Sequence, residues 1–128
     1  GPGAAWRYGR RYGPGWASYH LVMERLDELR SRHADQLAGF CARWRIRELA
    51  LFGSVLRDDF RAESDIDVLV TFAPDHPWSI VDHVQMEAEL SALFGRRVEM
   101  TSRMAVESSP NWLRRREIFE TARTLYAA

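Results

Sequence analysis

The stretch Leu51-Phe-Gly-Ser-Val-Leu-Arg-Asp-Asp-Phe-Arg-Ala-Glu-Ser-Asp-Ile-Asp-Val-Leu-Val70 decides how this chain is organised. The segment from Asp65 to Phe72 has the β-branched and apolar content of a strand, and alternate residues of a strand share a face. Asp65 and Asp67 therefore point to one side, opposite an apolar row formed by Ile66, Val68, Val70 and Phe72. Because a one-residue slip would bury both carboxylates, this row fixes the orientation of the strand.

The two aspartates indicate a metal site. Two like charges about 6–7 Å apart along a strand repel each other, and a hard divalent cation that prefers oxygen ligands relieves the repulsion. We therefore expect Asp65 and Asp67 to face a cleft and to bind Mg²⁺.

Gly53 and Ser54 follow a second apolar run and precede a segment that fits one helical turn. Glycine lets the backbone approach a ligand closely, and Ser54 can present its N–H and hydroxyl to a phosphate. This corner is typical of an anion-binding turn. Arg57, just beyond it, either contacts a phosphate oxygen or forms a surface ion pair with Asp58 or Asp59.

A strand with two aspartates and a Gly-Ser turn are each common alone, and their combination is informative. Gly53, Ser54, Asp65 and Asp67 form the pattern G-S-x10-D-x-D, which resembles the signature of the DNA polymerase β-like nucleotidyltransferases. Within that superfamily, the short length of the chain and the residues that flank both motifs resemble those of the minimal nucleotidyltransferases (MNT). These proteins often act as antitoxins paired with HEPN toxins. The resemblance extends from about Met23 to the C-terminus.

This resemblance implies a fold, a reaction and further site residues. The implied fold is α+β, with a small mixed sheet, helices packed on one face and the metal site on the other. The implied reaction is Mg²⁺-dependent transfer of AMP from ATP to a hydroxyl, which we expect to be a tyrosine of a cognate HEPN toxin. Glu99 lies where the family commonly has a third aspartate that helps a metal activate the attacking hydroxyl, and it is one methylene longer.

Composition limits the other possibilities. The 128 residues, 46% of them apolar, suffice for one small core without a separate substrate domain. Eighteen basic and eighteen acidic residues cancel, which argues against nucleic acid as a direct partner. The single cysteine, Cys41, cannot form an internal disulfide, which is consistent with a reducing compartment. The sequence shows no apolar run of membrane length and no signal peptide, so we expect the protein in the cytoplasm.

The remaining segments are assigned from their periodicity. Residues 1–22 are interpreted as a flexible leader or a vector-derived remnant, and residues 23–128 as the domain. Three- and four-residue spacing predicts helices from Val22 to Trp44, from Ser79 to Gly95 and from Asn111 to Tyr126. Strands are predicted at 45–52 and 96–101. The run Arg114-Arg115-Arg116 is either a solvated surface or a partner-facing one.

Two alternatives to a protein-modifying enzyme stay open. The chain could neutralise a toxin by covering it, with a vestigial carboxylate site, or it could adenylylate a small hydroxylated molecule. The motif specifies only the donor half of the reaction, so it does not identify the acceptor.

Overall fold

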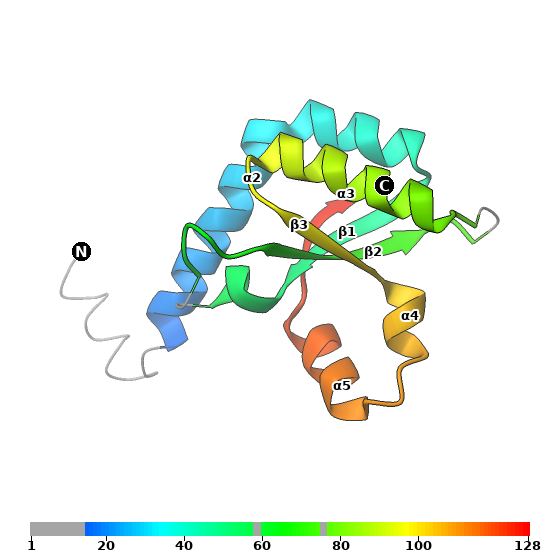
Figure 1. Cartoon of the computed structure of the whole chain (residues 1–128). Coiled ribbons are helices and arrows are strands. Elements are labelled where there is room, and N and C mark those ends of the chain that lie inside the picture. Colours follow the sequence, from blue (N-terminus) through cyan, green and yellow to red (C-terminus); the bar gives the residue numbers. More distant parts are fainter. Residues whose placement is uncertain (1–14, 58–59, 75–76) are drawn as a thin grey trace.

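The computed structural model describes residues 15–57, 60–74 and 77–128 (Figure 1). Its elements follow the chain in this order: helix α2 (Gly15–Arg43), strand β1 (Ile46–Phe52), the 3₁₀ turn η1 (Gly53–Leu56), strand β2 (Ile66–Phe72), helix α3 (Ile80–Phe94), strand β3 (Val98–Ser102), helices α4 (Arg103–Glu107) and α5 (Trp112–Thr121), and strand β4 (Arg123–Ala127).

The strands form one mixed sheet in the order β3-β2-β1-β4. Strand β1 is antiparallel to both β2 and β4, whereas β2 and β3 are parallel. Parallel neighbours need a crossover, and α3 supplies it between β2 and β3. The expected α+β class with a small mixed sheet is confirmed.

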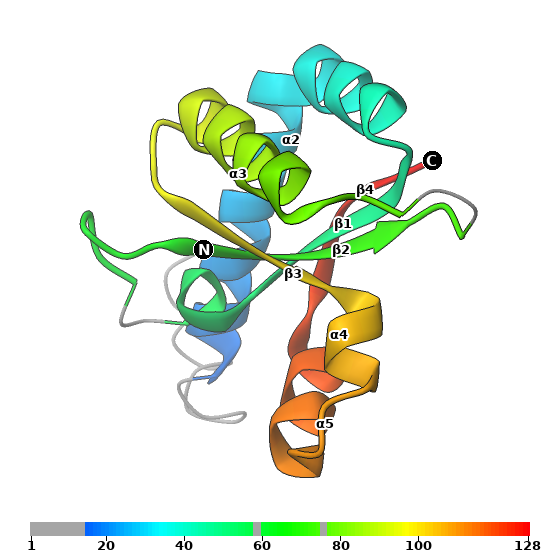
Figure 2. The same ribbon diagram turned by 45° about the vertical axis from the view of Figure 1, so that its right-hand side comes forward.

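Helices α2 and α3 pack on one face of the sheet (Figures 1 and 2). Their buried side chains meet the inward-facing residues of the strands in the main core, which includes Leu26, Leu37, Met86, Leu90, Leu49, Val68 and Val70. Ser79 caps α3 through a reciprocal capping box with Asp82, and Gly95 ends it in the left-handed conformation, so both predicted signals are confirmed.

A smaller apolar cluster lies on the opposite face, where α4 and α5 extend below the sheet (Figure 2). It joins Ala50, Phe52 and Leu69 of the strands to Val106 of α4 and Ile118 of α5. These residues cover only part of this face. The uncovered part is where polar side chains of β2 and β3 can meet a ligand.

The predicted last helix, Asn111 to Tyr126, is wrong in its second half. Helix α5 ends at Thr121, and residues 123–127 form β4, which pairs with the edge of β1. The spacing of the apolar residues suits a helix, but Leu125 instead enters the main core with 3% exposure. Arg30 of α2 also donates hydrogen bonds to the carbonyls of Thr124 and Leu125, so tertiary contacts override the local period.

The first helix is longer than the expected span from Val22. Helix α2 begins at Gly15, so residues 15–22 of the interpreted leader are helical, and residues 1–14 lie outside the described residues. Within the described part of the chain, no helix has the length and apolar content to cross a membrane.

Candidate active site

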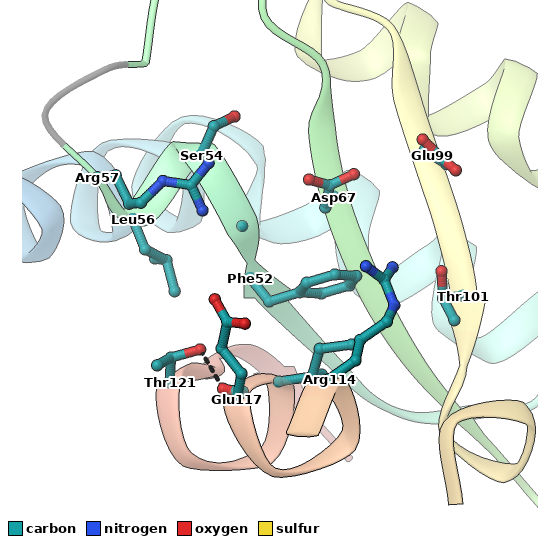
Figure 3. Close-up of a pocket in the computed structure, with 12 residues that line it drawn as sticks. Phe52, Ser54, Leu56, Arg57, Asp67, Glu99, Thr101, Arg114, Glu117 and Thr121 are labelled. Carbon is teal, nitrogen blue, oxygen red and sulfur yellow. Dashed lines mark hydrogen bonds between the residues drawn. The ribbon is translucent and has the colours of Figure 1, made fainter. Parts of the chain in front are cut away.

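A pocket of about 450 Å³ opens on the partly covered face of the sheet (Figure 3). Three walls enclose it. The η1 wall carries Gly53, Ser54, Leu56 and Arg57; the sheet wall carries Phe52, Asp67, Glu99 and Thr101; the α5 wall carries Arg114, Glu117, Ile118 and Thr121.

Strand pairing aligns the acidic residues of the sheet wall. Asp67 of β2 is the register partner of Glu99 on the parallel strand β3, and Phe52 of β1 pairs with Asp67 on its other side. Directly paired residues project to the same face, so both carboxylates enter the pocket (Figure 3).

The electrostatics of Asp67 reflect this crowding. Desolvation by burial and then the charges of Glu99 and Asp65 raise the pKa of the Asp67 carboxyl, while Arg114 and Arg57 act to lower it. Three carboxylates are thus close enough to interact, with two guanidinium groups facing them. Asp65 precedes β2 and does not line the pocket; its Oδ2 lies 3.9 Å from Nε of Arg97.

The η1 turn is held by contacts from outside the pocket. Nη1 of Arg25 on α2 donates to the carbonyls of Val55 (2.9 Å) and Arg57 (3.0 Å). Nη1 of Arg96 donates to the carbonyls of Arg61 (2.9 Å) and Ser64 (3.2 Å), in the loop that leads to β2.

The Phe60 ring joins these two anchors. The guanidinium carbon of Arg25 lies 5.0 Å from the ring centroid and that of Arg96 lies 4.2 Å from it. We call Arg25, Phe60 and Arg96 the loop clamp. It fixes the described parts of the segment that joins the Gly-Ser turn to the aspartate strand.

The structure therefore brings most of the sequence-predicted residues to one pocket. Gly53, Ser54, Arg57, Asp67 and Glu99 line it, and Asp65 lies within electrostatic range of Asp67. The alternative ion pairs of Arg57 involve Asp58 and Asp59, which lie outside the described residues.

Sequence reasoning missed the α5 wall and the loop clamp. The sequence groups Arg114 with Arg115 and Arg116 in one basic run, but only Arg114 of the three lines the pocket. A capping asparagine three residues before Arg114 was visible in the sequence, but it could not show where the helix packs.

The donor set suits Mg²⁺ held together with a nucleotide. Within the described residues, no group of three His, Cys, Asp or Glu side chains forms a ready metal cluster. Magnesium usually takes one or two protein carboxylates and completes its shell with water and substrate phosphates. Asp67 and Glu99, with Asp65 nearby, provide such oxygen donors, and their mutual repulsion favours a cation between them.

Comparison with known proteins decides the family. The family model described as "Nucleotidyltransferase domain" matches residues 34–125, which include β1, β2, β3, the η1 turn and the three carboxylates, and reach into β4. The chain belongs to this nucleotidyltransferase family. It is therefore a nucleotidyltransferase enzyme by family, and the pocket lined by Gly53, Ser54, Asp67 and Glu99 is its candidate active site.

Individual relatives agree with this assignment. The nucleotidyltransferase is 30% identical over 88 residues to the protein adenylyltransferase MntA of Thermococcus cleftensis, covering 69% of this chain and 84% of the relative. A solved structure provisionally described as a minimal nucleotidyltransferase is 31% identical, with a TM-score of 0.57 and coverage of 77% of this chain and 93% of that one.

A third likeness concerns the fold alone. It is to a chain from the complex of a tri-AMPylated HEPN toxin of Shewanella oneidensis with an MNT antitoxin, with 14% identity, a TM-score of 0.52 and coverage of 78% and 73%. The nucleotidyltransferase is thus similar in sequence to an adenylyltransferase and in fold to chains of MNT–HEPN complexes.

Proposed function

We propose that this nucleotidyltransferase transfers AMP from Mg²⁺-bound ATP to a tyrosine hydroxyl of a cognate HEPN toxin, and thereby acts as an antitoxin. The observation that supports this most is the register of Asp67 and Glu99 beside the Gly53-Ser54 turn. Oxygen donors for a cation and a turn for phosphates then face the same pocket. The cytoplasm is the compartment in which we expect the reaction.

Each wall has a role in this reaction. The η1 turn binds the terminal phosphates through the backbone and hydroxyl of Ser54, with Arg57 beside them. Asp67, Glu99 and Asp65 would hold Mg²⁺, which when bound offsets phosphate charge and makes the acceptor hydroxyl more acidic. The acceptor enters on the Glu99 side.

The bond changes follow from this arrangement. The acceptor oxygen forms a bond to the α-phosphorus while the bond between that phosphorus and the bridging oxygen of the β-phosphate breaks. Pyrophosphate leaves with the electron pair, and the hydroxyl proton passes to the carboxylate of Glu99. Holding the two reactants in line supplies much of the rate, because positioning replaces a bimolecular encounter.

The choice of donor and acceptor rests on the comparisons. The adenylyltransferase relative covers most of this chain's domain, which supports ATP as donor. The AMPylated toxin in the Shewanella oneidensis complex supports a HEPN protein as acceptor, although that likeness is one of fold.

The test uses the HEPN protein encoded beside this gene, purified and incubated with α-labelled ATP and Mg²⁺. We expect label on a toxin tyrosine, loss of label after Tyr→Phe at that site, and loss with Asp67→Asn or Glu99→Gln. Glu28→Gln, an exposed carboxylate paired with Arg32 on α2, is the matched control and should keep full transfer.

Neutralisation in cells separates modification from covering. If Asp67→Asn and Glu99→Gln abolish labelling yet protect cells as well as the unmodified chain, the chain acts by covering the toxin and the proposal fails. Label on a small molecule, with none on the toxin, would equally overturn the proposed acceptor.

A further inference from the structure

Three successive arginines at the start of α5 have different surroundings. Nη1 of Arg115 donates to the carbonyl of Ser109 at 2.6 Å, which ties α5 to the preceding loop. Nε of Arg116 pairs with Oε1 of Glu120 at 2.9 Å on the outer surface of the helix. Arg114 alone of the three lines the pocket, where its guanidinium points between Asp67 and Thr101 (Figure 3).

The backbone beneath Arg114 is fixed. Its N–H donates to Oδ1 of Asn111, the N-cap of α5, at 3.1 Å. Ile118, one turn further along, anchors the same helix in the smaller apolar cluster with 4% exposure. The guanidinium is therefore carried by a capped and anchored helix rather than by a loop.

The distribution of charge shows which ligand group Arg114 suits. Asp67, Glu99 and Glu117 give the pocket three carboxylates, against the two cations Arg57 and Arg114. Arg57 lies on the η1 wall, beside the turn that suits the terminal phosphates. Arg114 lies across the pocket, on the side of Asp67, Glu99 and Thr101, where the bonds to the α-phosphorus would form and break (Figure 3).

We propose that Arg114 contacts a non-bridging oxygen of the α-phosphoryl group and stabilises the charge on that group in the transition state. The inference rests on the proposed AMP transfer and adds a catalytic residue to it. A guanidinium is permanently charged and presents several donors in a planar fork, which matches phosphoryl oxygens. Because the helix that carries the guanidinium is capped and anchored before reaction, the backbone under this donor needs no reorganisation as charge develops.

The first test is the separation of turnover from nucleotide binding. Arg114→Gln should lower kcat for AMP transfer about 10²–10³-fold, the loss typical of one preorganised charge-stabilising donor, and change the Kd for Mg·ATP less than about threefold. Arg114→Lys, which keeps the charge but loses the fork, should recover part of the rate. Arg116→Ala, on the same helix and outside the pocket, is the control and should keep the rate of the unmodified chain.

The second test locates the contact on the α-phosphoryl group. Each of the two ATPαS diastereomers replaces one non-bridging α-oxygen by sulfur, a poorer hydrogen-bond acceptor. With the unmodified chain, we expect at least one diastereomer to react more slowly than ATP; with Arg114→Gln, that rate ratio should shrink toward one. With Arg116→Ala it should not change.

The outcomes distinguish this inference from the proposed function. If the unmodified chain transfers AMP and Arg114→Gln keeps kcat within twofold, or lowers it while both sulfur effects persist, Arg114 does not contact the α-phosphoryl group and the inference fails alone. If the unmodified chain transfers no AMP, the proposed function fails and the inference with it.

Discussion

A Cβ atom added to Gly53 would lie 2.3 Å from Oδ2 of Asp67, so the start of the η1 turn leaves no room for a side chain beside this carboxylate of β2. Gly53 also has φ of +77°, in the left-handed region that side chains disfavour. Two independent constraints therefore require glycine at the same point. They also link the two halves of the G-S-x10-D-x-D pattern, because the turn can approach the carboxylate only without a side chain.

Gly53→Ala should consequently impair the site more than the fold. The left-handed conformation costs an alanine about 1–2 kcal/mol, and the new methyl group must displace the flexible Asp67 carboxylate. We expect urea denaturation to show a loss of that size and AMP transfer to fall below detection in the folded protein.

Two other glycines serve as controls for Gly53→Ala. Gly95 has φ of +67° with no atom within 4 Å of an added Cβ, so Gly95→Ala should cost similar stability and spare transfer. Gly39 lies inside α2 and also has no atom within 4 Å of an added Cβ. Gly39→Ala should therefore raise the free energy of unfolding by roughly 0.5–1 kcal/mol. Full transfer by Gly53→Ala would contradict the close contact with Asp67.

Asp67→Asn should raise the stability of the metal-free protein at neutral pH. The folded-state pKa of this carboxyl is raised, so ionised Asp67 destabilises the fold, and the cost is fully present above the raised pKa. As pH falls through that value the folded carboxyl takes up its proton, and below the ordinary value of 3.8 the cost is gone. The difference in Tm between Asp67→Asn and the unmodified chain should shrink correspondingly.

Asp82→Asn provides the opposite case for the same measurement. The Asp82 carboxylate accepts hydrogen bonds from the N–H and hydroxyl of Ser79 in the capping box of α3. Weakening that cap should lower the free energy of unfolding by roughly 0.5–2 kcal/mol at neutral pH.

For Asp67→Asn itself, a Tm below that of the unmodified chain in the metal-free protein at neutral pH would contradict the crowding of the three carboxylates.

Ser54→Ala should weaken Mg·ATP binding. A hydroxyl that donates to a charged phosphate contributes roughly 1.5–3 kcal/mol, or about a 10- to 150-fold change in Kd. Titration calorimetry with and without Mg²⁺ measures it, and Ser31→Ala on the exposed side of α2 is the control. Tight ATP binding that is indifferent to both Ser54 and Mg²⁺ would count against the phosphate turn.

Cys41 offers a probe of global opening. The thiol is 1% exposed and burial raises its pKa to about 12, so almost no reactive thiolate is present at pH 8. Alkylation by iodoacetamide should be slow in the folded protein and become rapid across the urea transition. Mg·ATP should slow it further, because a ligand that binds only the folded state suppresses opening. Rapid labelling in the folded state would contradict the burial of the thiol.

Several parts of the fold can be predicted from short stretches of sequence. The strand from Ile66 to Phe72, the Gly53 turn, and the start and end of α3 at Ser79 and Gly95 depend on neighbours within a few residues, and the structure matches them. Such features are legible because alternation, caps and left-handed glycines act over one or two turns of chain.

Long-range contacts set the limit of that reading. Strand β4 forms because it pairs with β1, and the sequence of residues 123–127 gives no indication of that pairing. The bond from Arg25 to the carbonyl of Val55 joins residues 30 positions apart, and the site of Arg114 depends on how α5 packs below the sheet. An arginine-rich chain contains many such side chains, so residue type alone could not single these out.

The loop clamp yields the last prediction. Arg25 donates two hydrogen bonds to carbonyls at the end of η1, and Arg96 donates two to the loop that follows. Because hydrogen bonds from charged donors contribute about 1.5–3 kcal/mol each, Arg25→Ala should leave the turn less ordered before it meets phosphate. ATP binding must then include the cost of ordering the turn, and we expect Kd to rise about tenfold, or about 1.4 kcal/mol, with kcat at saturating ATP less affected.

Phe60→Leu, which removes the ring that both guanidinium groups contact, should act in the same direction. Arg32→Ala, which loses only an exposed pair with Glu28 on the same helix, is the control. If Arg25→Ala lowers Tm while the folded fraction binds ATP with unchanged Kd, the clamp stabilises the fold and does not organise the phosphate turn.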